Sequence, residues 1–374
     1  MKKKVFNKSE VVDKKIDFTM LITIIILLCI GLVMVASASS YYALSTFGDS
    51  NYFLTRQLIL GIAGVVAMLV ISKIDYKIYK KWSYLFYFVA LILLIAVLIP
   101  GIGQERNGAT RWLGFGAFQF QPSEMMKIAL VLAMSTYISA NYKKTKNIKG
   151  YIIPALMLIA VVVVMFLQKH MSGTLVMVVA AVSIIFASGI KINWKLFIAG
   201  FLIVLVAGGA FIMAEDFRRT RILAFLNPEE DITGDNWQAA QSLYAIGSGG
   251  IFGRGLGQSR QKYLWLPEAQ NDFIFSVLGE ELGLVGTTVV LALFAFFIFR
   301  GYKISMTCKD MYGSLIAMGI TSVFALQILV NIAVVTCTMP VTGMPLPFFS
   351  YGGTALFINL CTMGILLNIS KNCK

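Results

Sequence analysis

The chain has 374 residues, of which 58% are hydrophobic and 13% charged, and its formal net charge is +14 at pH 7. Soluble globular domains have an apolar share nearer one half, so this composition excludes a soluble globular protein. Several apolar runs of about 18 residues or more are long enough to cross a bilayer as helices. A β-barrel is excluded too, because barrel strands alternate in polarity and give a much weaker hydropathy signal.

The apolar runs predict an all-α fold, a polytopic membrane protein with about ten transmembrane helices. They form a single transmembrane domain over residues 1–374, with an N-terminal tail at residues 1–16 and a long polar loop before the eighth span. The predicted spans are residues 18–38, 53–72, 83–100, 122–140, 150–168, 172–189, 193–213, 272–299, 312–338 and 350–369.

The charge pattern predicts the orientation of these spans. With the N-terminal tail in the cytoplasm, about two thirds of the 32 Lys and Arg residues lie on short cytoplasmic loops and tails, as the positive-inside rule expects. The charge of +14 therefore reflects membrane topology, and no nucleic acid partner is needed. An even number of spans returns the C-terminus to the cytoplasm. The first span lacks a small-residue cleavage site, so we interpret it as a retained anchor.

The longest non-apolar stretch is the loop of residues 214–271, which this topology places outside the cytoplasm. Loops of this length inside a compact fold are usually functional or disordered. Its many aromatic residues argue against disorder. We therefore predict that this extracytoplasmic loop is the working part of the protein, with Asp272 at its membrane end.

Three patterns stand out inside the long loop. Arg218, Arg219 and Arg221 cluster near its start, where guanidinium groups suit either a pyrophosphate or the anchoring of lipid headgroups. Residues 237–246 have the spacing of a surface helix that lies on the membrane. Six glycines within residues 247–257 allow the backbone to approach a ligand closely or to act as a hinge.

Asp272 opens the eighth predicted span. Gly279 and Gly283 lie on the helical face beneath it and allow another helix to pack closely. Asp272 therefore belongs to the buried face, although a helix N-cap is an equally ordinary role for Asp. Glu280 and Glu281 lie two to three turns lower and need partners inside the bundle, for which Arg or Lys residues of other spans are candidates.

Glu124 and Lys127 are three residues apart at the start of the fourth span, which begins with Pro122. An ionisable pair inside a membrane span is costly and is a functional hypothesis by default. The alternative is a buried structural ion pair. Before this span, Arg111 places a cation at the membrane face, and Asn107–Gly108 predicts a tight turn.

The remaining polar features admit fewer interpretations. His170, in the turn between the fifth and sixth spans, is either a proton carrier or a polar turn residue. Residues 339–353 are uncharged and rich in Pro and Gly, a composition tolerated at membrane depth where backbone lines a cavity. The five cysteines are scattered and support neither a disulfide framework nor a zinc site.

Several of these segments together resemble one family, the SEDS (shape, elongation, division and sporulation) proteins typified by FtsW, RodA and SpoVE. The matching stretches occur in the family's order along most of the chain, and the one before Asp272 is most similar to the FtsW/SpoVE branch. They are NGATRW, QPSEMMK, FRRTRILAFLNP, GLGQSRQKYLWLPEAQNDF and PVTGMPLPFFSYGGT.

This resemblance implies a peptidoglycan glycosyltransferase of the bacterial cytoplasmic membrane that polymerises lipid II, the lipid-linked disaccharide-pentapeptide. It implies a class B penicillin-binding protein as partner, together with divisome or sporulation proteins. The family's catalytic Asp falls on Asp272. Its substrate-binding residues fall on Arg111, Glu124, Lys127, Arg218, Arg221 and Glu268. Many members have Pro-Asp where this chain has Lys169–His170, so no carboxylate role carries over there.

The residues and the resemblance lead to one mechanistic hypothesis. Asp272 accepts a proton from a sugar hydroxyl as that hydroxyl displaces polyprenyl pyrophosphate with inversion, and the cationic residues stabilise the leaving group. These residues identify no certain cofactor, and a divalent cation, Mg²⁺ or Mn²⁺, at the pyrophosphate is left open as an alternative. The rival hypotheses are a flippase for the lipid-linked precursor and a non-catalytic scaffold.

Overall fold

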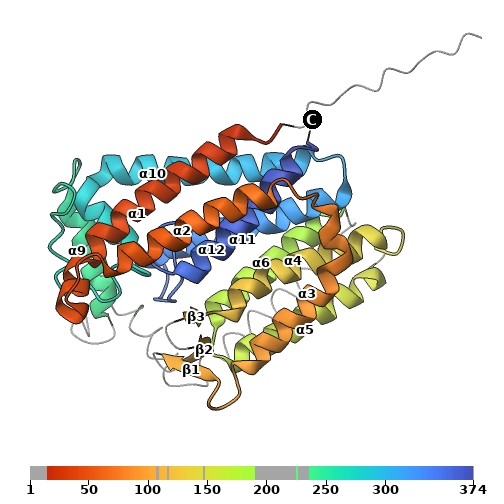
Figure 1. The fold of residues 1–374 in the computed structure, drawn as a ribbon, viewed down its shortest axis with the longest axis horizontal. Helices are drawn as coiled ribbons and strands as arrows, with labels where there is room; N and C mark the ends of the chain where they lie inside the picture. The colour runs from red at the N-terminus through yellow and green to blue at the C-terminus, as the bar shows by residue number, and fades with distance from the viewer. Residues whose placement is uncertain are drawn as a thin grey trace, which may run out of the picture.

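The computed structural model describes residues 15–106, 109–115, 118–145, 148–189, 225 and 236–373, which form a bundle of long helices with one small sheet (Figure 1). The predicted span 193–213 and the predicted site residues Arg218 and Arg221 lie outside the described residues. The elements are α1 (Phe18–Phe47), α2 (Tyr52–Ile71), α3 (Lys77–Ala96), β1 (Gly103–Arg106), β2 (Ala109–Phe115), β3 (Phe118–Phe120), α4 (Pro122–Ala140), the 3-10 helix η1 (Ile148–Tyr151), α5 (Ile152–Leu167), α6 (Met171–Ala187), α9 (Trp237–Gly249), α10 (Ile274–Thr307), α11 (Met311–Val335) and α12 (Gly353–Ser370).

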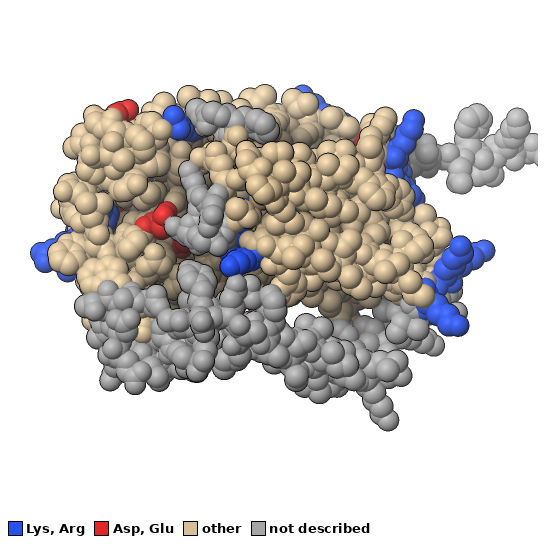
Figure 2. All heavy atoms as spheres, turned by 90° about the horizontal axis from the view of Figure 1, so that it is seen from below, with Lys and Arg blue, Asp and Glu red and all other residues tan. Residues whose placement is uncertain are grey.

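Every predicted span that falls within the described ranges is a helix, which confirms a polytopic helical membrane protein. Seven of the described helices are long and apolar enough to cross a membrane, while α6 is apolar but has 17 residues. One face of the molecule shows a broad band of uncharged side chains between charged groups toward its two ends (Figure 2). The seven helices are α1, α2, α3, α5 (counted from Lys149), α10, α11 and α12.

Several helices are longer than the apolar runs predicted. α1 continues past residue 38 to Phe47, where Gly48, in a left-handed conformation (φ 72°), donates its N–H to Leu44 O at 3.0 Å. α10 continues past residue 299 to Thr307. Hydropathy marks only the lipid-embedded part of a helix, whereas the backbone hydrogen bonds continue into the polar flanks until a cap ends them.

The helices form two groups, one of α1, α2, α10, α11 and α12 and the other of α3, α4, α5 and α6 (Figure 1). α11 joins the groups because it packs against α4 and α6 as well as α10. α4 and α11 bury residues on most of their circumference, as expected for helices surrounded by protein. α2 and α3 bury only a narrow stripe and leave large apolar side chains exposed.

A three-stranded antiparallel sheet, β1–β2–β3, precedes α4, where the sequence predicted only a tight turn at Asn107–Gly108. Leu113 of β2 pairs with Gly103 of β1 and with Phe120 of β3, and its side chain is buried. We call this side of the bundle the sheet end. At the opposite, terminal end, the Asp17 backbone N–H donates to Ser370 Oγ at 2.9 Å.

α10 is interrupted at Gly283, whose backbone (φ 64°, ψ −164°) is not helical. The part after the break, residues 284–307, is about 36 Å long at 1.5 Å per residue and is sufficient to cross a bilayer. The prediction for Gly279 is confirmed, since α9 packs against it with Ile246. The prediction for Gly283 as a helix-packing residue is wrong, because this glycine forms the break.

The predicted helix 237–246 is α9, which extends to Gly249. Its buried face consists of small and polar residues that pack against α10 and α11. Ser242 Oγ lies 2.7 Å from Ser276 Oγ and donates to Val335 O at 2.6 Å. The helix is therefore fixed to the bundle by polar contacts on one face.

Candidate functional site

Asp272 lies at the sheet end, just before α10. The N-cap position of α10 is Phe273, and no side chain caps this end, so the N-cap interpretation of Asp272 is wrong. Its backbone carbonyl accepts a hydrogen bond from Asn331 Nδ2 at 2.8 Å, and the same amide group donates to Met344 O at 2.7 Å. Asn331 thereby ties the start of α10 to the Pro/Gly-rich segment 339–353.

The environment of the Asp272 side chain favours its protonated form. Burial and the nearby charge of Glu268 raise the pKa of Asp272 to about 7, although the charge of Arg111 lowers it. Gly343 (φ 68°) passes so close that a Cβ there would lie 3.3 Å from Asp272 Oδ2. A carboxyl group that has a pKa near neutrality and does not cap a helix is suited to accept a proton at the operating pH.

Arg111 projects from β2 toward the turn between α5 and α6, where its Nη2 donates to Lys169 O at 2.5 Å. The next residue, His170, lies in this turn and is buried, with 7% of its surface exposed. Its Nδ1 has no hydrogen-bond partner among the described residues. Burial and the charges of Arg111 and Lys127 lower the pKa of His170 well below 6.5, so the imidazole is uncharged at neutral pH.

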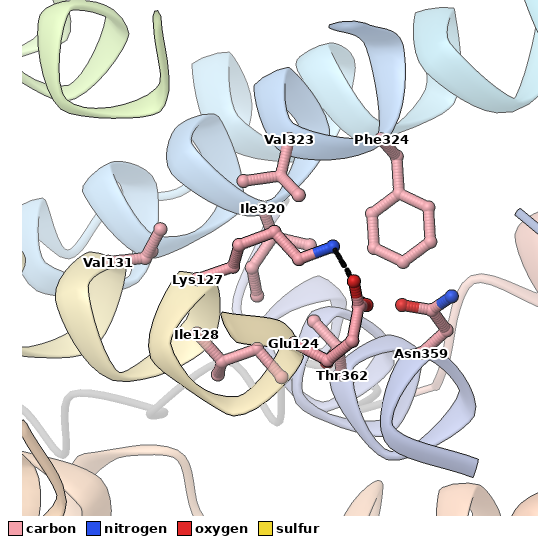
Figure 3. Close-up of a pocket in the computed structure, with 9 residues that line it drawn as sticks. All are labelled: Glu124, Lys127, Ile128, Val131, Ile320, Val323, Phe324, Asn359 and Thr362. Atoms are coloured by element: carbon pink, nitrogen blue, oxygen red, sulfur yellow. Dashed lines mark hydrogen bonds and ion pairs between the residues drawn. The ribbon is translucent and has the colours of Figure 1, made fainter. Parts of the chain in front are cut away.

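Glu124 and Lys127 form a buried ion pair near the start of α4. Lys127 Nζ lies 2.8 Å from both carboxylate oxygens of Glu124, and both side chains are about 6% exposed. Figure 3 shows the two side chains pointing toward each other between α11 and α12, with Asn359 beside the carboxylate. The pair lines a cavity of about 10 Å³, which is about the size of one water molecule.

The fold brings four residues that are far apart in the sequence close together at the sheet end, namely Arg111, Lys127, His170 and Asp272. The charge of Arg111 acts on both Asp272 and His170, and the charge of Lys127 acts on His170. Glu268 lies on the same side: its side chain is exposed, and it accepts a hydrogen bond from Asn271 Nδ2. Substrate binding by these residues stays a prediction.

Two contributors to this neighbourhood were not predicted as site residues. Asn331 of α11 lies in an apolar run, and its single amide carried no distinguishing signal in the sequence. Gly343 belongs to segment 339–353, for which the Pro/Gly composition did indicate irregular backbone beside a cavity. Within the described part of the chain, no group of three or more His, Cys, Asp or Glu side chains is arranged to hold a metal ion.

Comparisons with known proteins agree with this architecture. The sequence pattern of a family described as cell cycle protein (FtsW, RodA and SpoVE) matches residues 18–374. Stage V sporulation protein E of Bacillus subtilis is 43% identical over 356 residues, which cover 95% of this chain and 97% of that protein. A probable peptidoglycan glycosyltransferase FtsW of Trichlorobacter lovleyi is 42% identical over 360 residues, covering 96% and 94%.

Solved structures show the same fold. One chain, from work on the structural coordination of polymerization and crosslinking by a peptidoglycan synthase complex, has a TM-score of 0.78 at 26% identity, covering 95% of this chain and 97% of that chain. The rod shape determining protein RodA of Thermus thermophilus has a TM-score of 0.69 at 25% identity, covering 96% and 97%. The chain therefore belongs to the SEDS family of cell cycle proteins, in the branch of FtsW and SpoVE.

Proposed function

We propose that this protein is a peptidoglycan glycosyltransferase that polymerises lipid II into glycan strands for cell division or sporulation. The observation that carries the proposal is the Asp272 carboxyl, which lies at the sheet end with a pKa near neutrality and the cation of Arg111 close by. Relatives about 40% identical over nearly the whole chain are named as probable peptidoglycan glycosyltransferases.

In the proposed reaction, a sugar hydroxyl of one lipid-linked disaccharide attacks the anomeric carbon of another chain. The new glycosidic C–O bond forms as the bond from that carbon to the pyrophosphate oxygen breaks. The hydroxyl proton passes to Asp272, and polyprenyl pyrophosphate leaves with the bonding electron pair. A single displacement inverts the anomeric configuration and needs one base, which one positioned carboxylate supplies.

The leaving pyrophosphate requires positive charge. Arg111 is the described cation whose charge reaches both Asp272 and His170, so we assign it to the pyrophosphate. Lys127 is a further candidate for the pyrophosphate, and its ammonium is paired with Glu124, as the spacing of the two residues predicted. Arg218 and Arg221 are proposed to complete the anion site, and Glu268 to contact the sugar or peptide part of lipid II.

The placement of charge favours polymerisation over a flippase. Among the described residues, the buried Lys, His, Asp and Glu side chains and the partly buried Asp272 all belong to the sheet end; the buried ones are Glu124, Lys127, His170, Lys262, Glu280 and Glu281. A flippase needs polar groups along a path through the whole bilayer, whereas a polymerase needs them on one side. We propose that the sheet end faces outward and that both termini face the cytoplasm. We also propose that a class B penicillin-binding protein binds this protein as its partner.

The test is polymerisation of purified lipid II by the full-length protein in detergent, with and without the cognate penicillin-binding protein. Glycan strands longer than the starting disaccharide are the expected product, accompanied by release of undecaprenyl pyrophosphate. Absence of glycan under both conditions, together with transfer of labelled lipid II between the leaflets of a proteoliposome, would establish the flippase instead.

The rate of polymerisation is expected to rise with pH through about pH 7, because the base must be ionised and burial raises the pKa of Asp272 to about 7. Below that pH, each further unit lowers the ionised fraction about tenfold. Replacing Glu268 by Gln removes a negative neighbour that raises this pKa, so the acid limb of kcat/KM is expected to move to lower pH. An unchanged acid limb in Glu268→Gln would contradict the assignment of that limb to Asp272.

A further inference from the structure

The break in α10 is bridged by the backbone of the glycine-rich segment. The N–H groups of Leu284 and Val285, after the break, donate to Gly250 O at 2.9 Å and Ile251 O at 3.1 Å. In the other direction, Arg254 N–H donates to the Glu280 carbonyl at 3.0 Å. The glycines of residues 247–257 therefore allow this backbone to pack closely against the backbone of α10.

The side chain of Glu280 is buried under this segment. Its carboxylate accepts hydrogen bonds from Ser259 Oγ at 2.6 Å and from the backbone N–H of Arg260 at 2.9 Å. Arg254 Nε lies 3.7 Å from Oε1 of this carboxylate. Glu280 is 1% exposed, and these donors satisfy the hydrogen bonding of its buried carboxylate.

Glu281 is fully buried and has a different set of partners. Its Oε1 lies 3.2 Å from Lys262 Nζ, and Ser37 Oγ of α1 donates to it at 2.6 Å. Lys262 is 4% exposed, and its ammonium also donates to Gly257 O at 2.7 Å. The sequence suggested Arg or Lys of other spans as partners for these carboxylates. That was wrong, because the cations come from the loop that precedes α10.

The segment between this ion pair and α10 is a short series of turns that ends at Asp272. Leu264 (φ 67°) and Glu268 (φ 54°) have left-handed backbones, a conformation that non-glycine residues hold only when the surrounding structure imposes it. Among the described residues, two hydrogen bonds tie the middle of the segment to other parts of the chain: Trp237 Nε1 donates to Trp265 O at 2.9 Å, and Tyr351 N–H donates to Gln270 O at 2.9 Å. Within the segment, Leu266 N–H donates to Gln261 O at 2.9 Å, and the Leu266 side chain is buried. Its two ends are fixed by Lys262 and by the first turn of α10.

We propose that Lys262 and Glu281 are positioning residues for polymerisation: their buried ion pair, joined to α1 through Ser37, fixes the turn segment that presents Asp272 to the substrate. The proposal rests on the proposed function. It does not place either side chain in contact with lipid II. Loss of the pair leaves a buried charge without its counter-ion and frees one end of the segment. A displacement of about 1 Å at a reacting group is sufficient to lower a rate about 10²-fold.

The test compares Lys262→Met, Lys262→Arg and Glu281→Gln with the wild type in the lipid II assay. Lys262→Met and Glu281→Gln are expected to lower kcat at least about tenfold while KM changes little, because the substrate contacts are intact. Lys262→Arg keeps the cation and is expected to retain most of the rate. Water admitted around Asp272 in Lys262→Met is expected to move the acid limb of the pH profile to lower pH.

A matched control is the ion pair of Arg300 with Asp17 at the terminal end of the same helix. Arg300→Met removes an ion pair from α10 far from Asp272, so it is expected to lower thermal stability without altering the pH profile. Equal loss of kcat in Lys262→Met and Lys262→Arg, or a wild-type kcat and pH profile in folded Lys262→Met, would overturn the proposal.

Two further variants, Lys262→Met/Glu281→Gln and Asp272→Asn, separate a loss of folding or of the proposed function from a loss of positioning. Where Lys262→Met does not fold, the double variant Lys262→Met/Glu281→Gln removes both charges of this ion pair, so neither is buried without its counter-ion, and the variant is expected to fold with a low kcat. Full activity of that double variant would overturn the proposal. Wild type and Asp272→Asn run in parallel: an inactive wild type counts against the proposed function, whereas an active wild type with a fully active Lys262→Met counts against the positioning role alone.

Discussion

Replacement of Asp272 by Asn is expected to lower the rate of lipid II polymerisation about 10²–10⁴-fold, the usual contribution of a positioned proton acceptor. Asn has nearly the same shape as Asp but cannot accept the hydroxyl proton near neutral pH. Since Asp272 does not cap α10, the substitution removes no helix cap. The measurement is the initial rate of glycan formation, with kcat and KM determined separately.

The stability of the same variant separates a catalytic role from a structural one. Burial raises the pKa of Asp272 from 3.8 to about 7, so the folded protein binds this proton more tightly than the unfolded chain does. The stability that this group contributes is present below about pH 4 and is lost as the pH rises through about 7. Asn carries no charge, so Asp272→Asn is expected to have a Tm at pH 8 equal to or above that of the wild type.

Asp49 provides a matched control, because it is an exposed carboxylate in the turn between α1 and α2 at the same end of the bundle. Asp49→Asn is expected to leave the polymerisation rate unchanged. Full polymerisation by Asp272→Asn would exclude the general-base role, and a covalent glycosyl-enzyme trapped on the wild type would exclude a single displacement.

The second large effect is expected at the buried pair of Glu124 and Lys127. Lys127→Met leaves the Glu124 carboxylate buried without its cation, which costs about 3–5 kcal/mol of folding stability when one partner of such a pair is removed. A large fall in Tm and in the yield of folded protein is therefore expected. Loss of polymerisation in this single variant would not distinguish binding from folding.

The double variant Glu124→Gln/Lys127→Met makes that distinction, because it removes both charges and leaves none buried alone. Its Tm is expected to return close to that of the wild type. If the pair helps to stabilise the pyrophosphate, polymerisation by the folded double variant stays at least about tenfold below wild type. Recovery of full activity together with stability would show that Glu124 and Lys127 form a structural ion pair only.

The backbone at the sheet end shows which structural features local sequence patterns predict and which they do not. Periodic glycines beneath Asp272 correctly predicted a close helix contact at Gly279, which α9 makes. The same pattern failed at Gly283, because a helical repeat assumes a continuous helix and the break is formed by hydrogen bonds to a segment some thirty residues earlier. The strands before α4 were likewise missed. They pair as local hairpins, but runs of 4, 7 and 3 residues are too short to show a clear strand period.

The sequence by itself determined the all-α membrane architecture, the identity of the ionisable residues in apolar surroundings, and the resemblance on which Asp272 and Arg111 were assigned. These depend on local properties, since the length of an apolar run and the cost of a charge within it are set by neighbouring residues. Only the tertiary structure decided that Asp272 is not a helix cap and that Lys262 is the partner of Glu281. Contacts between distant residues follow from packing and from the need to pair every buried charge, which no local pattern specifies.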